Sequence, residues 1–100
     1  MWILESTDAE LPFMFRILPG SIKTVGRAPR ADFIVDAALV SRLHCRLTLD
    51  AGGLGVEDLG STNGTWVNGQ KIARAPLSAG DTLKVGRVEF AVKAAEEHRS

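Results

Sequence analysis

The chain has 100 residues, 45% hydrophobic and 24% charged, which suits one globular domain. Basic and acidic side chains number 12 each, and no apolar run is long enough for a bilayer, so neither nucleic acid nor a membrane is an expected partner. One cysteine, Cys45, excludes an internal disulfide. The single cysteine and the lack of an export signal lead us to expect an intracellular protein, cytoplasmic or, in a eukaryote, nuclear. Between Arg16 and Arg46, six basic residues face two acidic ones, and this net charge of +4 favours a small anionic ligand.

The first half of the chain predicts short strands separated by loops. Strands are expected at residues 2–4, 13–18, 21–25 and 33–35, and the second of these alternates in polarity with a period of two. Residues 7–12 and 26–30 contain proline, or glycine with proline, and predict loops. Residues 36–41 are less clear, because their alanines suit a helical turn but the segment is too short for a stable helix.

The second half continues the same pattern. Strands are expected at residues 45–49, 54–58, 65–67, 70–72, 82–85 and 88–92. Residues 75–81 contain Pro76 and Gly80 and predict a loop, and residues 93–100 predict a frayed tail or a short helix. Many short strands with no convincing long helix indicate an all-β sandwich or closed barrel, whose end loops are the natural place for function.

Residues 58–69 carry two Asn-Gly pairs, Asn63-Gly64 and Asn68-Gly69. Asn-Gly favours the type I′ hairpin turn, in which both central residues have positive φ, so the segment predicts a short strand between two tight turns. Residues 60–63, Gly-Ser-Thr-Asn, offer hydroxyls, an amide and backbone N–H groups to a ligand. Taken alone, the segment is better explained as a hairpin tip that binds nothing.

Two further segments offer chemistry. Arg27 follows Gly26 at the end of a predicted strand, and a loop arginine suits phosphate through charge-assisted, bidentate hydrogen bonds. By itself it also fits an ordinary solvated arginine. Ser41 and Arg42 precede a strand, with His44 three residues after the serine. We interpret His44 as a histidine that hydrogen-bonds loop backbone.

Enzymatic alternatives find little support. A catalytic set of Ser41, His44 and Asp58 lacks the Gly-x-Ser-x-Gly elbow and an oxyanion loop. Cys45 falls on the inward side of its predicted strand, which disfavours a nucleophile. One cysteine and two distant histidines make a poor zinc site, and neither a P-loop nor a dinucleotide fingerprint is present. We therefore expect no enzyme activity, no metal and no cofactor.

The order and spacing of these motifs closely resemble the forkhead-associated (FHA) domain. The matching residues run from 2 to 93 and include Gly26-Arg27, Asp32-x-x-Val35, Val40-Ser41-Arg42-x-His44, Asp58-Leu59-Gly60-Ser61, Asn63-Gly64, Asn68-Gly69 and Leu77-x-x-Gly80-Asp81-x-Leu83-x-Val85-Gly86. Cys45 stands where the family often has alanine, and no pocket position departs from the pattern. The resemblance implies an all-β, FHA-type sandwich of about eleven short strands with ligand loops at one end. It implies a domain at residues 1–93 and a tail at 94–100.

The resemblance also implies a function and a site. FHA domains bind phosphothreonine in partner proteins, so it implies a signalling module whose partner is phosphorylated by a Ser/Thr kinase. It assigns phosphopeptide binding to Arg27, Ser41, Arg42, Thr62 and Asn63, and structural support of the site to Gly26, His44 and Gly64. For the peptide residue three places after the phosphothreonine, we expect Ala38, Leu39 and Arg30 to matter. The alternative that stays open is an interaction or self-assembly module that uses the sandwich surface without phosphate.

Overall fold

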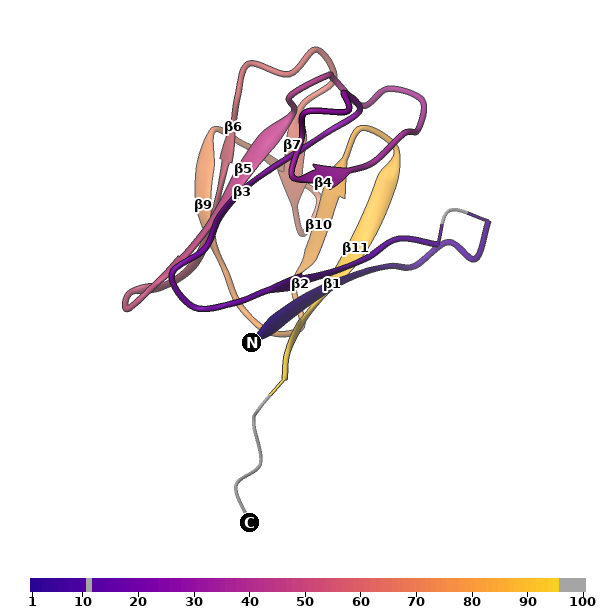
Figure 1. Ribbon diagram of the computed structural model, residues 1–100. Helices are drawn as coiled ribbons and strands as arrows, with labels where there is room; N and C mark the ends of the chain where they lie inside the picture. Colours follow the sequence, from indigo (N-terminus) through magenta and orange to yellow (C-terminus); the bar gives the residue numbers. More distant parts are fainter. Residues whose placement is uncertain (11, 96–100) are drawn as a thin grey trace.

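The computed structural model describes residues 1–10 and 12–95, and these form two β-sheets packed face to face (Figure 1). In spatial order, the six-stranded sheet contains β2 (Met14–Ile17), β1 (Trp2–Ser6), β11 (Val88–Ala94), β10 (Thr82–Val85), β7 (Thr65–Val67) and β8 (Gln70–Ile72). The five-stranded sheet contains β4 (Phe33–Ile34), β3 (Ile22–Gly26), β5 (Cys45–Asp50), β6 (Gly53–Asp58) and β9 (Arg74–Leu77). The expected all-β sandwich is confirmed. The described residues contain no helix, so none that would span a bilayer.

The period-two alternation of apolar residues accounts for the core between the sheets. In β5, Cys45, Leu47 and Leu49 are buried while Arg46 and Thr48 face outward. Because successive side chains of a strand point to opposite faces, this alternation gives the sheet one apolar and one polar face. The largest fully buried side chain is that of Phe90, and the aliphatic residues around it include Leu4, Ile17, Leu47, Leu83, Val25, Val56 and Val85.

The expected loop at residues 75–81 is partly wrong. Residues Arg74–Leu77 form β9, which pairs antiparallel with β6 and makes one edge of the five-stranded sheet. Pro76 lacks an N–H to donate, but an edge strand needs only one of its two sides for pairing, so proline is tolerated there. The sequence pattern concealed this strand because proline usually marks a loop.

Other boundaries differ by one or two residues. Strand β1 runs on to Ser6, and β2 begins at Met14 because the Phe13 N–H bonds the Ser6 hydroxyl oxygen at 2.8 Å. Strand β11 continues through Ala94, which pairs with Trp2, so it covers the first residues of the expected tail. The remainder of that tail, residues 96–100, lies outside the described residues. Segment 36–41 forms a turn, not a helix, with the Val40 N–H 3.3 Å from the Ala37 carbonyl oxygen.

The loops that follow β3, β4 and β6 gather at one end of the sandwich (Figure 1). The chain begins at the other end, and β11 leaves the sandwich there too. The turn between β10 and β11 lies at the loop end, so both sheets contribute to the region described next.

Candidate phosphopeptide-binding site

An open pocket of about 560 Å³ lies among these loops. Its lining comes from three segments that are distant in sequence: Arg27, residues 36–41, and Thr62 with Asn63. Four of the five residues assigned to phosphopeptide binding by sequence, Arg27, Ser41, Thr62 and Asn63, are therefore brought together. Ala38 and Leu39, expected to influence specificity, line the same pocket.

Arg27 enters the pocket directly after β3. Its backbone N–H donates to the Ser41 carbonyl at 2.9 Å, and its Nε donates to the Val40 carbonyl at 3.1 Å. These bonds fix the start of the side chain and the plane of the guanidinium. Both Nη groups have no partner among the described residues, so the parallel N–H groups that suit a phosphate are unused.

Ser41 and Thr62 join the two main loops. The Thr62 backbone N–H donates to the Ser41 hydroxyl oxygen at 3.1 Å. The serine oxygen is thus an acceptor toward the protein, and its own hydrogen is available to donate elsewhere. The Thr62 side chain is exposed at the pocket lining.

His44 lies beneath the pocket and is fully buried. The Ser41 backbone N–H donates to Nδ1 at 3.0 Å, and Nε2 lies 2.7 Å from the Gly64 carbonyl oxygen. Because a carbonyl only accepts, Nε2 carries the proton and Nδ1 is the acceptor. The imidazole is therefore neutral, and it connects the Ser41 loop to the Asn63-Gly64 segment.

Asn63 approaches the neighbouring loop through its side chain. Its Nδ2 donates to the Leu39 backbone carbonyl at 3.1 Å, and the backbone carbonyl of Asn63 accepts from the Trp66 indole N–H at 3.3 Å. Leu39 has φ of 71°. At the Asn63-Gly64 pair only Gly64 has positive φ, whereas both residues of Asn68-Gly69 do. The expected positive φ at both residues is thus present at 68–69 and absent at 63–64, where Asn63 is held by the bonds to Leu39 and Trp66.

Asp58 holds loop 59–64 in shape. One carboxylate oxygen accepts from the N–H groups of Gly60 at 3.0 Å and Ser61 at 3.1 Å, and the other from the hydroxyls of Ser61 at 2.5 Å and Thr65 at 2.7 Å. Desolvation by burial raises the pKa of Asp58, but these hydrogen bonds outweigh it and lower the pKa below its ordinary value. Sequence reasoning missed this role. An aspartate followed by glycine and serine was the available signal, since that composition is typical of Asx turns.

Two glycines are required near the pocket for different reasons. A Cβ on Gly26 would lie 2.0 Å from the Arg42 carbonyl oxygen, so a larger residue would push the end of β3 away from the loop that contains Ser41. Gly64 has φ of 91°, a conformation that favours glycine. A Cβ there would meet the Lys71 side chain, whose Cε is 2.9 Å away, so the backbone conformation is the stronger constraint.

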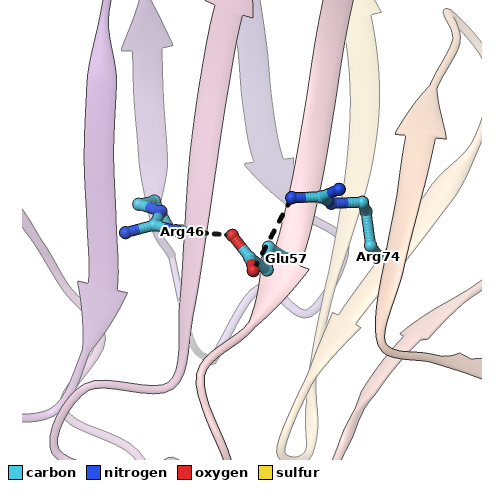
Figure 2. Close-up of polar contacts among 3 residues, drawn as sticks. All are labelled: Arg46, Glu57 and Arg74. Carbon is cyan, nitrogen blue, oxygen red and sulfur yellow. Dashed lines mark hydrogen bonds and ion pairs between the residues drawn. The ribbon is translucent and has the colours of Figure 1, made fainter.

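The other predicted cations lie elsewhere. Arg42 and Arg30 are exposed and do not line the pocket. Arg46 belongs to the outward face of β5, where its Nη2 is 2.5 Å from Glu57 on β6, and Arg74 on β9 reaches the same carboxylate at 3.9 Å (Figure 2). The pKa of Glu57 is lowered by the hydrogen bond and charge of Arg46. The basic stretch seen in the sequence is therefore divided between a pocket and a sheet face.

The contacts do not form a catalytic set. The His44 ring bonds two backbone groups and not the Ser41 hydroxyl, while the Asp58 carboxylate binds its own loop and not His44. Cys45 is fully buried, and burial, with the Asp58 charge adding to it, raises the pKa of its thiol to about 12. Neither the serine nor the thiol is activated as a nucleophile.

A comparison with known protein families gives a match to the FHA domain over residues 23–86. The chain belongs to the FHA domain family. Among curated proteins, the glycogen accumulation regulator GarA of Mycobacterium tuberculosis is 37% identical over 71 residues, which are 71% of this chain and 44% of GarA. The chain thus spans less than half the length of GarA and of other curated relatives that it matches.

Solved FHA structures are similar over almost the whole chain. The FHA domain of CT664 from Chlamydia trachomatis has a TM-score of 0.87 at 27% identity, covering 95% of this chain and 98% of that one. A chain solved in a structural and functional analysis of phosphothreonine-dependent FHA domain interactions has a TM-score of 0.86 at 28% identity, covering 96% and 98%. The similarity to FHA structures therefore extends to β1, β2 and β11, which lie outside residues 23–86 matched by the family model.

Proposed function

We propose that this chain is a non-catalytic module that binds phosphothreonine peptides of a partner protein phosphorylated by a Ser/Thr kinase. One observation carries the proposal. Arg27, Ser41 and Thr62 line one pocket, and the arginine Nη groups and the serine hydrogen have no partner among residues 1–10 and 12–95. Membership of the FHA family and the similarity to a chain studied for phosphothreonine-dependent interactions support it.

The chemistry of a phosphate matches these donors. A phosphothreonine carries a charge of about −1.5 to −2 at neutral pH and three strong acceptor oxygens. Arg27 would bind two of them in a bidentate manner and Ser41 the third, while the exposed Arg42 side chain would add charge from the rim. No base, metal or nucleophile takes part, because no bond is broken.

Peptide recognition would extend beyond the phosphate. Asn63 has a free Oδ1 and one free N–H in the described part of the chain, and these suit the donor and acceptor of a peptide backbone. Residues 36–39 supply small and apolar surface, with Leu39 56% exposed. We propose that this segment favours an aliphatic side chain at the third position after the phosphothreonine.

An oriented phosphothreonine library would first select a binding sequence. Calorimetric titration would then compare that peptide with its unphosphorylated, phosphoserine and phosphotyrosine versions. We expect binding of the phosphothreonine peptide only. Equal affinity for the phosphorylated and unphosphorylated peptides would contradict the proposal and favour recognition by another part of the sandwich surface.

A further inference from the structure

The turn between β10 and β11 brings Gly86 against a pocket loop that belongs to the opposite sheet. Gly86 is buried with φ of 61°. A Cβ at this position would lie 2.5 Å from the carbonyl oxygen of Leu39 and 2.7 Å from its carbonyl carbon. Both neighbours are backbone atoms, so no side-chain rotation would relieve the overlap. Any other residue at position 86 would have to displace the Leu39 peptide group.

That peptide group is already in an uncommon conformation. Leu39 has φ of 71°, and positive φ is unusual for a bulky residue without a surrounding structure that enforces it. Two contacts of its carbonyl are evident, the close approach to Gly86 and the hydrogen bond from Asn63 Nδ2. The carbonyl thus lies between the β10–β11 turn and the loop that carries Asn63, which joins β6 to β7.

The carbonyl also determines how the Asn63 amide is oriented. An asparagine side chain can present either its oxygen or its NH₂ group to a neighbour, and a carbonyl accepts only from the NH₂ group. The bond to Leu39 therefore excludes the flipped amide. It leaves Oδ1 and the second N–H of Asn63 in a single arrangement for a ligand.

We propose that Gly86 is a positioning residue of the phosphothreonine site. By admitting the Leu39 carbonyl, it fixes the amide orientation in which Asn63 meets the peptide backbone. Gly86 does not itself line the pocket, so its effect on a ligand is transmitted through Leu39 and Asn63. The inference rests on the proposed function and extends it to a turn in the other sheet.

The first experiment compares Gly86→Ala with Gly20→Ala. Gly20 has φ of 83°, and a Cβ at this position would have no atom within 4 Å. Alanine at position 20 would therefore have the strain of a positive φ, as at position 86, but no steric overlap. We expect Gly86→Ala to weaken binding of the selected phosphothreonine peptide by about tenfold and Gly20→Ala by less than about twofold. Unchanged affinity in Gly86→Ala, or an equal loss in both variants, would overturn the inference.

A double-mutant cycle with Asn63→Ala tests the route of the effect. If Gly86 acts through the Asn63 amide, Gly86→Ala should change affinity by less than about twofold once Asn63 is alanine, because interacting positions are not additive. General loosening of the domain would instead give the same loss in both backgrounds. That result would overturn the positioning role.

Should Gly86→Ala fail to fold, NMR of the wild-type domain without peptide tests the same step. The inference requires the Asn63 side-chain NH₂ group to stay bonded to the Leu39 carbonyl, so one of its two protons should exchange with solvent more slowly than the other, whereas equal and fast exchange of both would contradict it. Equal affinity of the wild-type domain for the phosphorylated and unphosphorylated peptides would contradict both the proposed function and this inference. If binding depends on the phosphate but the losses caused by Gly86→Ala and Asn63→Ala are additive, only the inference about Gly86 is contradicted.

Discussion

Arginine occurs in two contrasting settings on this domain. In the pocket, Arg27 uses Nε for the Val40 carbonyl and keeps both Nη groups unpaired within the described structure. On the outer face of the five-stranded sheet, Arg46 and Arg74 share the carboxylate of Glu57 (Figure 2). One region presents unused donors beside a hydroxyl and an amide, and the other pairs its guanidinium groups with a carboxylate.

The contrast shows why local net charge is an incomplete guide to an anion site. Arg27 and Arg46 belong to the same basic stretch of sequence, yet Arg46 is paired with a carboxylate, whereas the hydrogen bond of Arg27 is to a backbone carbonyl. What separates them is the partner at hydrogen-bond distance. A backbone carbonyl at Nε orients the guanidinium without neutralising it, whereas a carboxylate competes directly with a bound phosphate.

The largest effect is expected from removing the imidazole beneath the pocket. His44→Ala leaves the Ser41 N–H and the Gly64 carbonyl without partners, and each unpaired buried group costs about 1–3 kcal/mol. We expect a clear loss of thermal stability, measured by calorimetry without peptide, and weaker binding as a consequence. Wild-type melting with abolished binding would show instead that His44 contacts the ligand directly.

The comparison between the two arginine regions is tested by matched substitutions. Arg27→Ala should weaken phosphopeptide binding by about tenfold or more, since hydrogen bonds to charged groups contribute about 1.5–3 kcal/mol. Arg74→Ala, on the sheet face, should leave affinity within about twofold, because exposed ion pairs contribute little. Both variants should melt close to wild type. Equal losses in the two would mean that overall charge, not the pocket, governs binding.

Much of the fold could be predicted from local patterns, and the strand β5 shows why. Its alternation of Cys45, Leu47 and Leu49 with polar residues requires no information from elsewhere in the chain. The same holds for the Asn68-Gly69 turn, which the Asn-Gly pair itself predicts, although Asn68 also bonds Asp81 and Thr82. Beyond that, the expectation of about eleven strands with the ligand loops at one end followed from resemblance to the FHA family.

The features that sequence reasoning missed depend on distant partners. Strand β9 exists because β6 offers a pairing edge, despite Pro76. The Asn63-Gly64 pair departs from a type I′ turn where Asn63 bonds the carbonyl of Leu39, 24 residues earlier in the chain. Neither Arg27's bond to Val40 nor the contact of Gly86 with Leu39 has a signal in the residues themselves, since each joins segments brought together only by the packing of two sheets.

Acid sensitivity distinguishes two adjacent carboxylates, Asp58 under the pocket loop and Glu57 on the sheet face. The pKa of each is lowered in the folded protein. A lowered folded pKa gives stability that is present above the unfolded pKa, about 4, and is lost as pH falls through the folded pKa. The melting temperature of the domain without peptide should therefore fall as the pH is lowered below about 4. Peptide is left out because its phosphate titrates near pH 6.

The two carboxylates should contribute unequally. Asp58→Asn replaces an acceptor of four hydrogen bonds with an amide whose nitrogen cannot accept, so it should lower stability at neutral pH and flatten the decline in acid. Glu57→Gln should have a smaller effect on melting and leave phosphopeptide affinity unchanged. An equal response of both variants would contradict the assignment of Asp58 to the binding loop.

The smallest expected effect concerns the third residue after the phosphothreonine. Asp36, Ala38 and Leu39 line the pocket, and Arg30 does not. Burying about 40 Å² of an aliphatic side chain would contribute roughly 1 kcal/mol, or about fivefold in affinity, whereas an acidic side chain would face Asp36. We therefore expect an oriented phosphothreonine library to favour Ile, Leu or Val over Asp at this position.

A charge substitution sharpens this prediction. Asp36→Lys should shift the library toward Asp and Glu at the third position, while Arg30→Ala, outside the pocket, should leave the profile unchanged. The cation that could instead pair with an acidic third residue is Arg87, which lines an adjoining pocket together with Asp36, Ala37 and Ala38. Asp8 and Glu10 line that pocket too, so Arg87 has acidic neighbours competing for it. Strong selection of Asp or Glu by the wild-type domain, lost in Arg87→Ala, would contradict the aliphatic preference and assign the reading of this position to Arg87.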